Sequence, residues 1–197
     1  MVVMCCVLGA CHNDYTPKPQ AYIRIDMPAH KYARLDTLPG NFEGIRVPGV
    51  VLPFTFEIND GVGVALKKNN QREVWVDLNY PEWDGVVFLS YKRLGSMEDL
   101  RGQTDTSLRL MESHYQFASG VEEDHFESTE HQVYGTTYRL HGSRVASTYQ
   151  FWVTDSAHHF LRGALYLNRT PNNDSLAPGR EYIQADLDHL VETLHWR

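Results

Sequence analysis

The sequence predicts an α+β fold: a single layered domain over residues 21–197, in which two or three helices pack on a mainly antiparallel sheet. Two observations lead to this prediction. Apolar and polar residues alternate in most segments between turn signals, which is typical of half-buried strands, and two other segments repeat their apolar residues with the period of a helix. Because no cysteine follows Cys11, the domain has no disulfide, and an apolar core must stabilise it.

Seven segments carry the strand pattern. They are residues 21–26, 52–58, 73–79, 86–91, 133–140, 144–154 and 158–167. The segment at 86–91 is apolar on both faces, which indicates a central strand. Residues 28–49 are expected to form a loop, because prolines and glycines recur along them.

Two segments carry the helical pattern. Ser96 and Asp99 have the spacing of a capping box. From Thr104 the apolar residues Leu108, Met111, Tyr115 and Ala118 share one helical stripe, and Gly120 is expected to stop this helix. A polar loop is expected at residues 168–177, followed by a final helix after Pro178 and Gly179. The apolar stripe of that final helix is Ile183, Leu187, Leu190, Val191 and Leu194.

The N-terminus carries a pattern typical of a bacterial lipobox. An uncharged apolar run ends in Leu8-Gly9-Ala10-Cys11, and the Cys11 thiol is the atom that would receive a diacylglycerol. This pattern predicts a lipoprotein signal peptide over residues 1–10. About ten apolar residues cannot span ~30 Å of hydrocarbon as a helix, so they do not predict a transmembrane anchor. The alternative is a buried N-terminal strand that carries a chance cysteine.

Residues 11–20 are expected to form an extended tether, because Pro17 and Pro19 favour extended backbone. Acyl chains on Cys11, such as palmitate, would then hold the domain on a membrane, each buried methylene contributing ~0.8 kcal/mol. The expected location is the cell envelope, with the domain facing the periplasm rather than the cell surface. The net charge of −7 and the lack of any Lys/Arg run disfavour nucleic acid as a partner.

The sequence predicts no enzyme and no cofactor. Residues 155–159 contain the side chains of a serine hydrolase triad, but neighbouring strand residues point to opposite faces and cannot converge. The ten histidines include no His-Glu-x-x-His motif, so no metal site is expected. The glycines near Asp60 are too few and too closely spaced for a nucleotide-binding loop.

Arg162 lies inside an otherwise apolar strand pattern, and a buried arginine needs a partner. We hypothesise that it pairs with Asp155 or with Asp174 and so fixes a structural or interaction loop that includes Asn172. The alternative is that Arg162 lies on an exposed face of the sheet.

The C-terminal third of the chain contains FLRGALY at residues 160–166, PNNDSLAP at 171–178 and ETLHW at 192–196. These three segments resemble the GldD family, gliding-motility lipoproteins of Bacteroidetes. The start of the family is similar to residues 17–25, where Gln20 and Ala21 replace the expected arginine and glycine. The resemblance covers most of the chain after Cys11.

The resemblance implies a cell-envelope lipoprotein required for gliding motility and linked to type IX secretion. It would act by contacts with other envelope proteins, and Cys11 is the one functional position that the resemblance transfers. A second interpretation, from the aromatic-rich sheet, is a periplasmic ligand-binding module with an aromatic-lined pocket.

Overall fold

The computed structural model describes residues 27–36, 45–46, 52–69, 72–142, 144–168 and 173–197. The predicted signal peptide, the tether and the strand at 21–26 lie outside this part of the chain. The described residues form strands and helices in separate parts of the chain, which confirms the α+β class. The strands form two sheets, however, and not the single layer that the sequence predicts.

The larger sheet has seven strands, and every neighbouring pair is antiparallel. In sheet order they are β4 (Gly63–Asn69), β5 (Glu73–Tyr80), β6 (Gly85–Arg93), β10 (His159–Leu167), β9 (Tyr149–Thr154), β8 (Val133–His141) and β7 (Gly120–Ser128). β6 lies inside the sheet between β5 and β10, so its predicted central position is confirmed.

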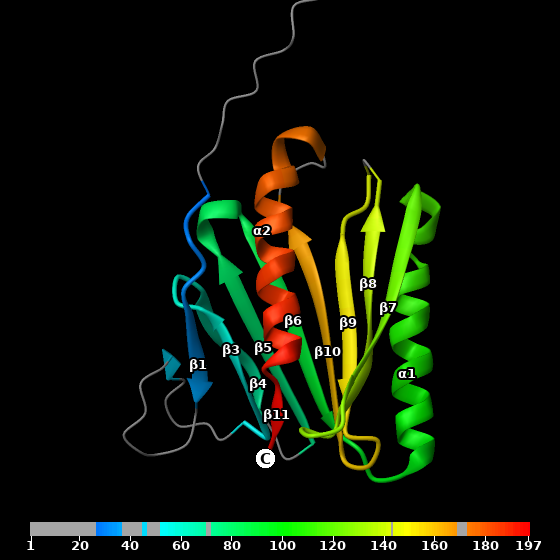
Figure 1. The fold of residues 1–197 in the computed structure, drawn as a ribbon. Helices are drawn as coiled ribbons and strands as arrows, with labels where there is room; N and C mark the ends of the chain where they lie inside the picture. Colours follow the sequence, from blue (N-terminus) through cyan, green and yellow to red (C-terminus); the bar gives the residue numbers. More distant parts are fainter. Residues whose placement is uncertain (1–26, 37–44, 47–51, 70–71, 143, 169–172) are drawn as a thin grey trace, which may run out of the picture.

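The smaller sheet has the order β11-β3-β1-β2. Its strands are β11 (His195–Trp196), β3 (Phe54–Asn59), β1 (Tyr32–Asp36) and β2 (Ile45–Arg46). β1 and β2 are parallel, whereas β3 is antiparallel to both β1 and β11. Because the last strand of the chain pairs with β3, the C-terminus is fixed beside the first half of the sequence (Figure 1).

The two helices cover opposite faces of the larger sheet. Figure 1 shows α2 (Asn173–Glu192) running along one face, where Ile183 and Leu187 join the main core with Phe151 of β9. α1 (Met97–Glu112) contacts β9 and β10, and Met111 packs in a second cluster that includes Trp152. Phe151 and Trp152 are adjacent on one strand and so point to opposite faces.

Several predicted elements are confirmed, and others need correction. The strands β3, β5, β6, β8 and β10 match their predicted ranges closely, and Ser96 caps α1 by accepting a hydrogen bond from the Asp99 amide at 3.1 Å. The stripe on α1 is partly wrong, because Ser107 and Met111 are buried while Leu108 is exposed. The predicted strand at 144–154 becomes regular only from Tyr149.

Five strands lie where the sequence predicts loop or no strand. β1 and β2 lie inside the predicted loop at 28–49, and β4 and β11 lie in segments without a strand prediction. β7 begins at Gly120, which the sequence assigns to a helix stop, whereas α1 already ends at Glu112. β7 is an edge strand with exposed residues over most of its length, so it lacks the alternation of a half-buried strand. β4 is the other edge of the same sheet.

The predicted polar loop at 168–177 is also wrong in its second half. α2 begins at Asn173 and contains Pro178 in its sixth position. A proline near the start of a helix is tolerated because the first four amides have no partner within the helix in any case, so the loss here is limited to about one backbone hydrogen bond.

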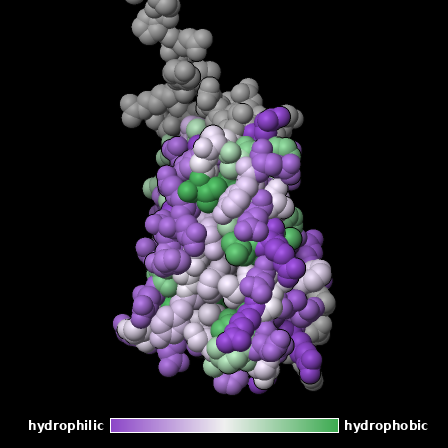
Figure 2. All heavy atoms as spheres, turned by 90° about the vertical axis from the view of Figure 1, so that its right-hand side faces the viewer, coloured by the Kyte–Doolittle hydropathy of each residue, from purple (hydrophilic) through white to green (hydrophobic). Residues whose placement is uncertain are grey.

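Figure 2 shows the side of the molecule that carries α1 and β7. Hydrophilic residues dominate this side, and apolar residues are scattered between them. Among the described helices, none is long and apolar enough to cross a bilayer.

Candidate functional site

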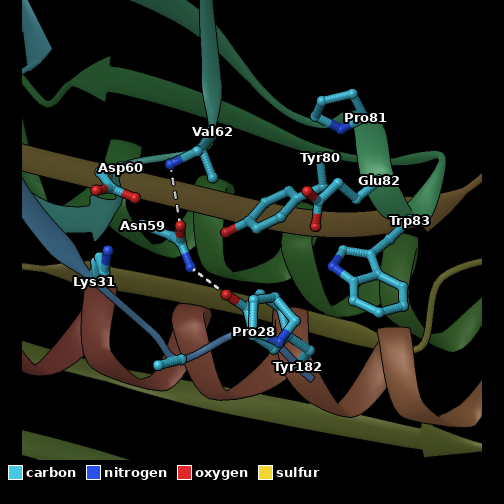
Figure 3. Close-up of a pocket in the computed structure, with 12 residues that line it drawn as sticks. Pro28, Lys31, Asn59, Asp60, Val62, Tyr80, Pro81, Glu82, Trp83 and Tyr182 are labelled. Atoms are coloured by element: carbon cyan, nitrogen blue, oxygen red, sulfur yellow. Dashed lines mark hydrogen bonds between the residues drawn. The ribbon is translucent and has the colours of Figure 1, made fainter. Parts of the chain in front are cut away.

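A cavity of about 460 Å³ lies beside the start of the described chain. Figure 3 shows that its walls come from segments that are far apart in the sequence. The lining residues are Pro28, Ala29, Lys31, Asn59, Asp60, Gly61, Val62, Tyr80, Pro81, Glu82, Trp83 and Tyr182. This volume is within the range of small-ligand sites in proteins.

The first wall is the turn between β3 and β4. Asn59 accepts a hydrogen bond from the Gly61 amide at 3.1 Å through its side chain, and its backbone carbonyl accepts one from the Val62 amide. The Asp60 amide donates to the carbonyl of Lys31 at 2.8 Å, which ties the turn to the segment before β1. These bonds give the turn a defined shape.

The second wall is the short 3₁₀ helix η1 (Pro81–Trp83), which follows β5 directly. Pro81 starts it with a preset φ angle, and Asp84 ends it in the left-handed region at φ 49°. The indole of Trp83 then packs against α2 at Gly179, where a Cβ atom would lie only 2.9 Å from Cδ2 of the indole. Gly179 therefore permits the close approach of Trp83 to the helix.

The third wall is Tyr182 of α2. Its ring stacks on the His30 ring with a centroid distance of 4.1 Å, and the Trp83 ring centroid is 5.7 Å away on a tilted plane. The Asn59 side-chain amide donates a hydrogen bond to the Tyr182 hydroxyl at 2.7 Å, drawn as a dashed line in Figure 3. Tyr182 is thus held from both its ring and its hydroxyl.

A buried carboxyl group lies behind this wall. Asp186 is 1% exposed, and its Oδ1 atom is 2.6 Å from Nδ1 of His30. Its Oδ2 atom makes no hydrogen bond of good geometry among the described residues. Burial, together with the nearby Asp186 carboxylate, raises the pKa of Tyr32 and of Tyr80 well above the ordinary value. These two hydroxyls stay protonated at neutral pH.

The mouth of the cavity is acidic. Asp60 and Glu82 are both exposed there, and Lys31 is the cation among the lining residues. Burial raises the pKa of the Tyr182 hydroxyl; the hydrogen bond from Asn59 lowers it, and the charges of Asp186, Glu82 and Asp60 raise it further. Two surface carboxylates are therefore close enough to act on the phenol that lines the site.

A polar cluster continues along α2 beyond the cavity. The Tyr32 ring stacks on the His189 ring at 3.7 Å, and Nε2 of His189 is 2.9 Å from Oε2 of Glu57. Arg34 donates to the other oxygen of Glu57 at 3.2 Å. The hydrogen bond from His189 and the charge of Arg34 lower the pKa of Glu57, against the opposing effect of burial. This cluster fixes β1 and β3 to α2.

The structure does not form the predicted pair between Arg162 and Asp155. The Arg162 guanidinium donates to Oε1 of Gln150 at 2.6 Å, and burial lowers its pKa. Arg162 is partly buried, on the face of the larger sheet that α1 only partly covers. Arg162 lies within β10, whereas Asp155 lies in the turn before that strand, so the two side chains do not meet.

Asp155 instead shapes the turn between β9 and β10. Its Oδ1 atom accepts hydrogen bonds from the amides of Ala157, His158 and His159 at 2.8–3.0 Å. Burial alone would raise the pKa of Asp155, but these three bonds together lower it. The carboxylate acts as a structural cap of this turn.

The other predicted site residues are not described in full. Cys11 and Asn172 lie outside the described residues, and Asp174 is placed only as part of the α2 backbone. Within the described part of the chain, no group of three or more metal-ligating side chains comes together.

No local pattern in the sequence points to the residues of the cavity. His30 and Asp186 are 156 positions apart, and nothing in the segments around them connects the two. The proline and glycine at 178–179 are the available signal, but such a pair indicates a helix boundary more readily than a close contact with Trp83.

A second surface stands out on the face of the larger sheet that α1 only partly covers. Trp75 of β5 is 45% exposed and Phe88 of β6 is 44% exposed. Trp75 is opposite Ser90, so Phe88 is its diagonal neighbour across the two strands, and the Phe88 ring centroid is 5.6 Å from that of Tyr166. We refer to Trp75, Phe88 and Tyr166 as the outer aromatic surface.

Comparison with known proteins gives one family. A family model described as "Gliding motility lipoprotein GldD" matches residues 12–196. No curated protein and no solved structure matches the chain significantly.

Proposed function

Because the chain belongs to the GldD family of gliding motility lipoproteins, we propose that acyl chains on Cys11 hold it on a membrane, where it supports motility by contacting other envelope proteins. The family description names a lipoprotein and a process, not an enzymatic activity. The proposal adds three finer points: that the contacts are direct, that they belong to the type IX secretion machinery, and that the domain faces the periplasm.

The sequence around Cys11 supports the anchor. The family match begins at residue 12, directly after the cysteine of the predicted lipobox. Such a boundary is expected if the family's common part is the chain that remains after cleavage before Cys11. Two or three acyl chains make membrane attachment effectively stable.

The outer aromatic surface is the observation that favours protein contacts. Large aromatic side chains are enriched among the residues that dominate binding energy at interfaces. Trp75 and Phe88 expose nearly half of their surface and are diagonal neighbours on adjacent strands, so both rings offer apolar area to a partner. A partner that covers them would bury this area.

The experiment is complementation of a deletion strain, with gliding speed as the readout and protein level as the check. We expect Cys11→Ala to abolish rescue, and Trp75→Ala with Phe88→Ala to reduce it at normal protein level. Met97→Ala is the matched control, because Met97 is an exposed apolar residue on α1 that is not part of this surface. Full rescue by the double variant would contradict a role of the surface in contacts.

The same strains test the link to type IX secretion and the periplasmic orientation. Loss of secreted type IX cargo in the culture medium, in parallel with gliding, is expected if the protein serves that machinery. Resistance of the domain to protease added to intact cells is expected if it faces the periplasm. Normal secretion in the deletion strain, or digestion of the domain in intact cells, would contradict the respective point.

A second candidate function is a ligand-binding module. The cavity lined by Tyr80, Trp83 and Tyr182 favours it, because aromatic walls with a few polar groups are typical of binding pockets. Trp83→Ala separates the two candidates: loss of gliding in this variant, with rescue by the outer-surface variant, would favour the cavity.

A further inference from the structure

We propose that the cavity binds the guanidinium group of an arginine that a peptide segment of another protein presents. This inference rests on the second candidate function, in which the cavity is a binding site, and it adds the chemical class of the ligand. It is carried by the walls of the cavity, by the charges at its mouth and by the way its side chains are held.

The walls suit a flat cation. The cavity is lined by the aromatic rings of Tyr80, Trp83 and Tyr182. The ring centroids of Trp83 and Tyr182 are 5.7 Å apart. A guanidinium group stacks on aromatic faces and is more weakly hydrated than an ammonium group, so it loses less on entering such a site.

The mouth supplies the complementary charge. Asp60 and Glu82 are exposed carboxylates on opposite walls, one on the β3–β4 turn and one on η1 (Figure 3). Among the residues that the structure describes, neither carboxylate forms an ion pair. Carboxylate oxygens accept paired hydrogen bonds from the two N–H groups of an arginine side chain. Because Lys31 offsets only one of the two carboxylates, the lining residues keep an excess of negative charge.

The aromatic walls are already fixed before a ligand arrives. Tyr182 is held by the Asn59 amide and by the His30 ring, and His30 is in turn bonded to the buried Asp186. The Trp83 indole packs against α2 at Gly179. Binding therefore costs little ordering of the walls, which favours affinity.

The volume of the cavity indicates a ligand larger than an arginine side chain alone. A volume of about 460 Å³ is at the lower end of the range for drug-sized ligands, so it accommodates an arginine side chain with adjoining peptide groups.

The test is isothermal titration calorimetry on the lipoprotein solubilised in detergent. The probes are acetyl-Gly-Arg-Gly-amide and the same peptide with citrulline, which keeps the shape of arginine and removes its charge. We expect the arginine peptide to bind at least tenfold more tightly than the citrulline peptide. Added salt is expected to narrow this difference, because the carboxylates are exposed.

The variants Glu82→Gln and Asp60→Asn locate the effect. Each is expected to weaken binding of the arginine peptide severalfold and to leave the citrulline peptide unchanged. Both residues are exposed, so neither change threatens folding. Glu98→Gln is the matched control, because Glu98 is an exposed carboxylate on α1, distant from the cavity lining, and it is expected to have no effect.

Three results would overturn the inference in different ways. Equal binding of both peptides, lost in Trp83→Ala, would keep the cavity as a binding site and reject its preference for a cation. Arg24 lies four positions before the lining residue Pro28 in the sequence, so it is the control for competition by this chain itself. Binding that appears only in an Arg24→Gln background would assign the cavity to this chain's own arginine instead of a partner's. Absence of binding by either peptide in both backgrounds would reject the inference while leaving the contact function of the outer aromatic surface intact.

Discussion

Replacement of Gly179 by alanine tests the contact that holds Trp83 against α2. A Cβ atom at this position would lie 2.9 Å from Cδ2 of the indole and nearer still to Cε3, so the ring must move. Overpacking of this kind costs ~1–3 kcal/mol. Alanine is favoured over glycine inside a helix by ~1 kcal/mol, which partly offsets the cost. We therefore expect the free energy of unfolding to fall by about 1 kcal/mol.

Two comparisons separate these opposing effects. Gly102 lies in α1, and a Cβ atom added there would meet no other atom within 4 Å, so Gly102→Ala is expected to stabilise by about 0.5–1 kcal/mol. In a Trp83→Ala background the obstacle at Gly179 is gone, and Gly179→Ala is expected to stabilise by a similar amount. The sign of one substitution thus reverses with the side chain that faces it.

The assay is urea unfolding followed by far-ultraviolet circular dichroism. For a chain of this size, a change of about 1 kcal/mol moves the melting temperature by about 2–4 °C, which gives an independent measurement. If Gly179→Ala stabilises the wild-type protein as much as Gly102→Ala does, the indole is not held against the helix. The cavity would then lack the fixed wall that Trp83 provides.

Three further predictions concern the core and the hairpin. Asp155→Ala should lower the free energy of unfolding by about 1–3 kcal/mol in urea melts at pH 7, because three amides lose their acceptor. Since the pKa of Asp155 is lowered in the folded state, this difference should shrink as the pH falls below about 4, and a difference that does not shrink on acidification would contradict the prediction. Burial lowers the pKa of His159, so this imidazole binds a proton more readily in the unfolded chain than in the folded protein. The melting temperature should therefore fall as the pH drops below about 6.5, and it should fall less steeply in His159→Gln. The same dependence of melting temperature on pH in both proteins would refute this. Tyr149→Phe should lower the free energy of unfolding by about 1–2 kcal/mol, because the hydroxyl of the fully buried Tyr149 donates a hydrogen bond to Asp188 at 2.6 Å. If the effects of Tyr149→Phe and Asp188→Asn are additive in a double-mutant cycle, this hydrogen bond does not contribute to stability.

The strands with one or two buried faces could be predicted from the sequence. β5 alternates buried and less buried residues along its length, so its pattern reports its surroundings directly. The apolar residues on both faces of β6 correctly predict its place inside the sheet, although Phe88 on its outer face is exposed. β7 has no such signal, because almost all of it is exposed at the sheet edge. Its pairing with β8 is the reason that it is a strand, and a pairing partner leaves little trace in a strand's own sequence.

The candidate site is beyond the reach of local patterns. It needs the segment before β1, the β3–β4 turn, η1 and α2 to meet, and the contact between His30 and Asp186 exists only after both sheets are in place. The predicted pair of Arg162 with Asp155 is absent for a related reason. Asp155 is satisfied by the backbone of its own turn, and the Gln150 side chain on β9 bonds the guanidinium instead.

The exposed edge strand β7 has a consequence for a protein attached to a membrane. Attachment confines neighbouring copies to two dimensions, where they meet edge to edge far more often than in free solution. β7 offers unpaired backbone groups for such an encounter, but the exposed carboxylates of Glu123 and Glu127 lie along it, whereas Glu122 and Asp124 pair with His141 and Arg139. Two approaching β7 strands would bring these carboxylates together, and their repulsion keeps crowded copies from joining into a continuous sheet.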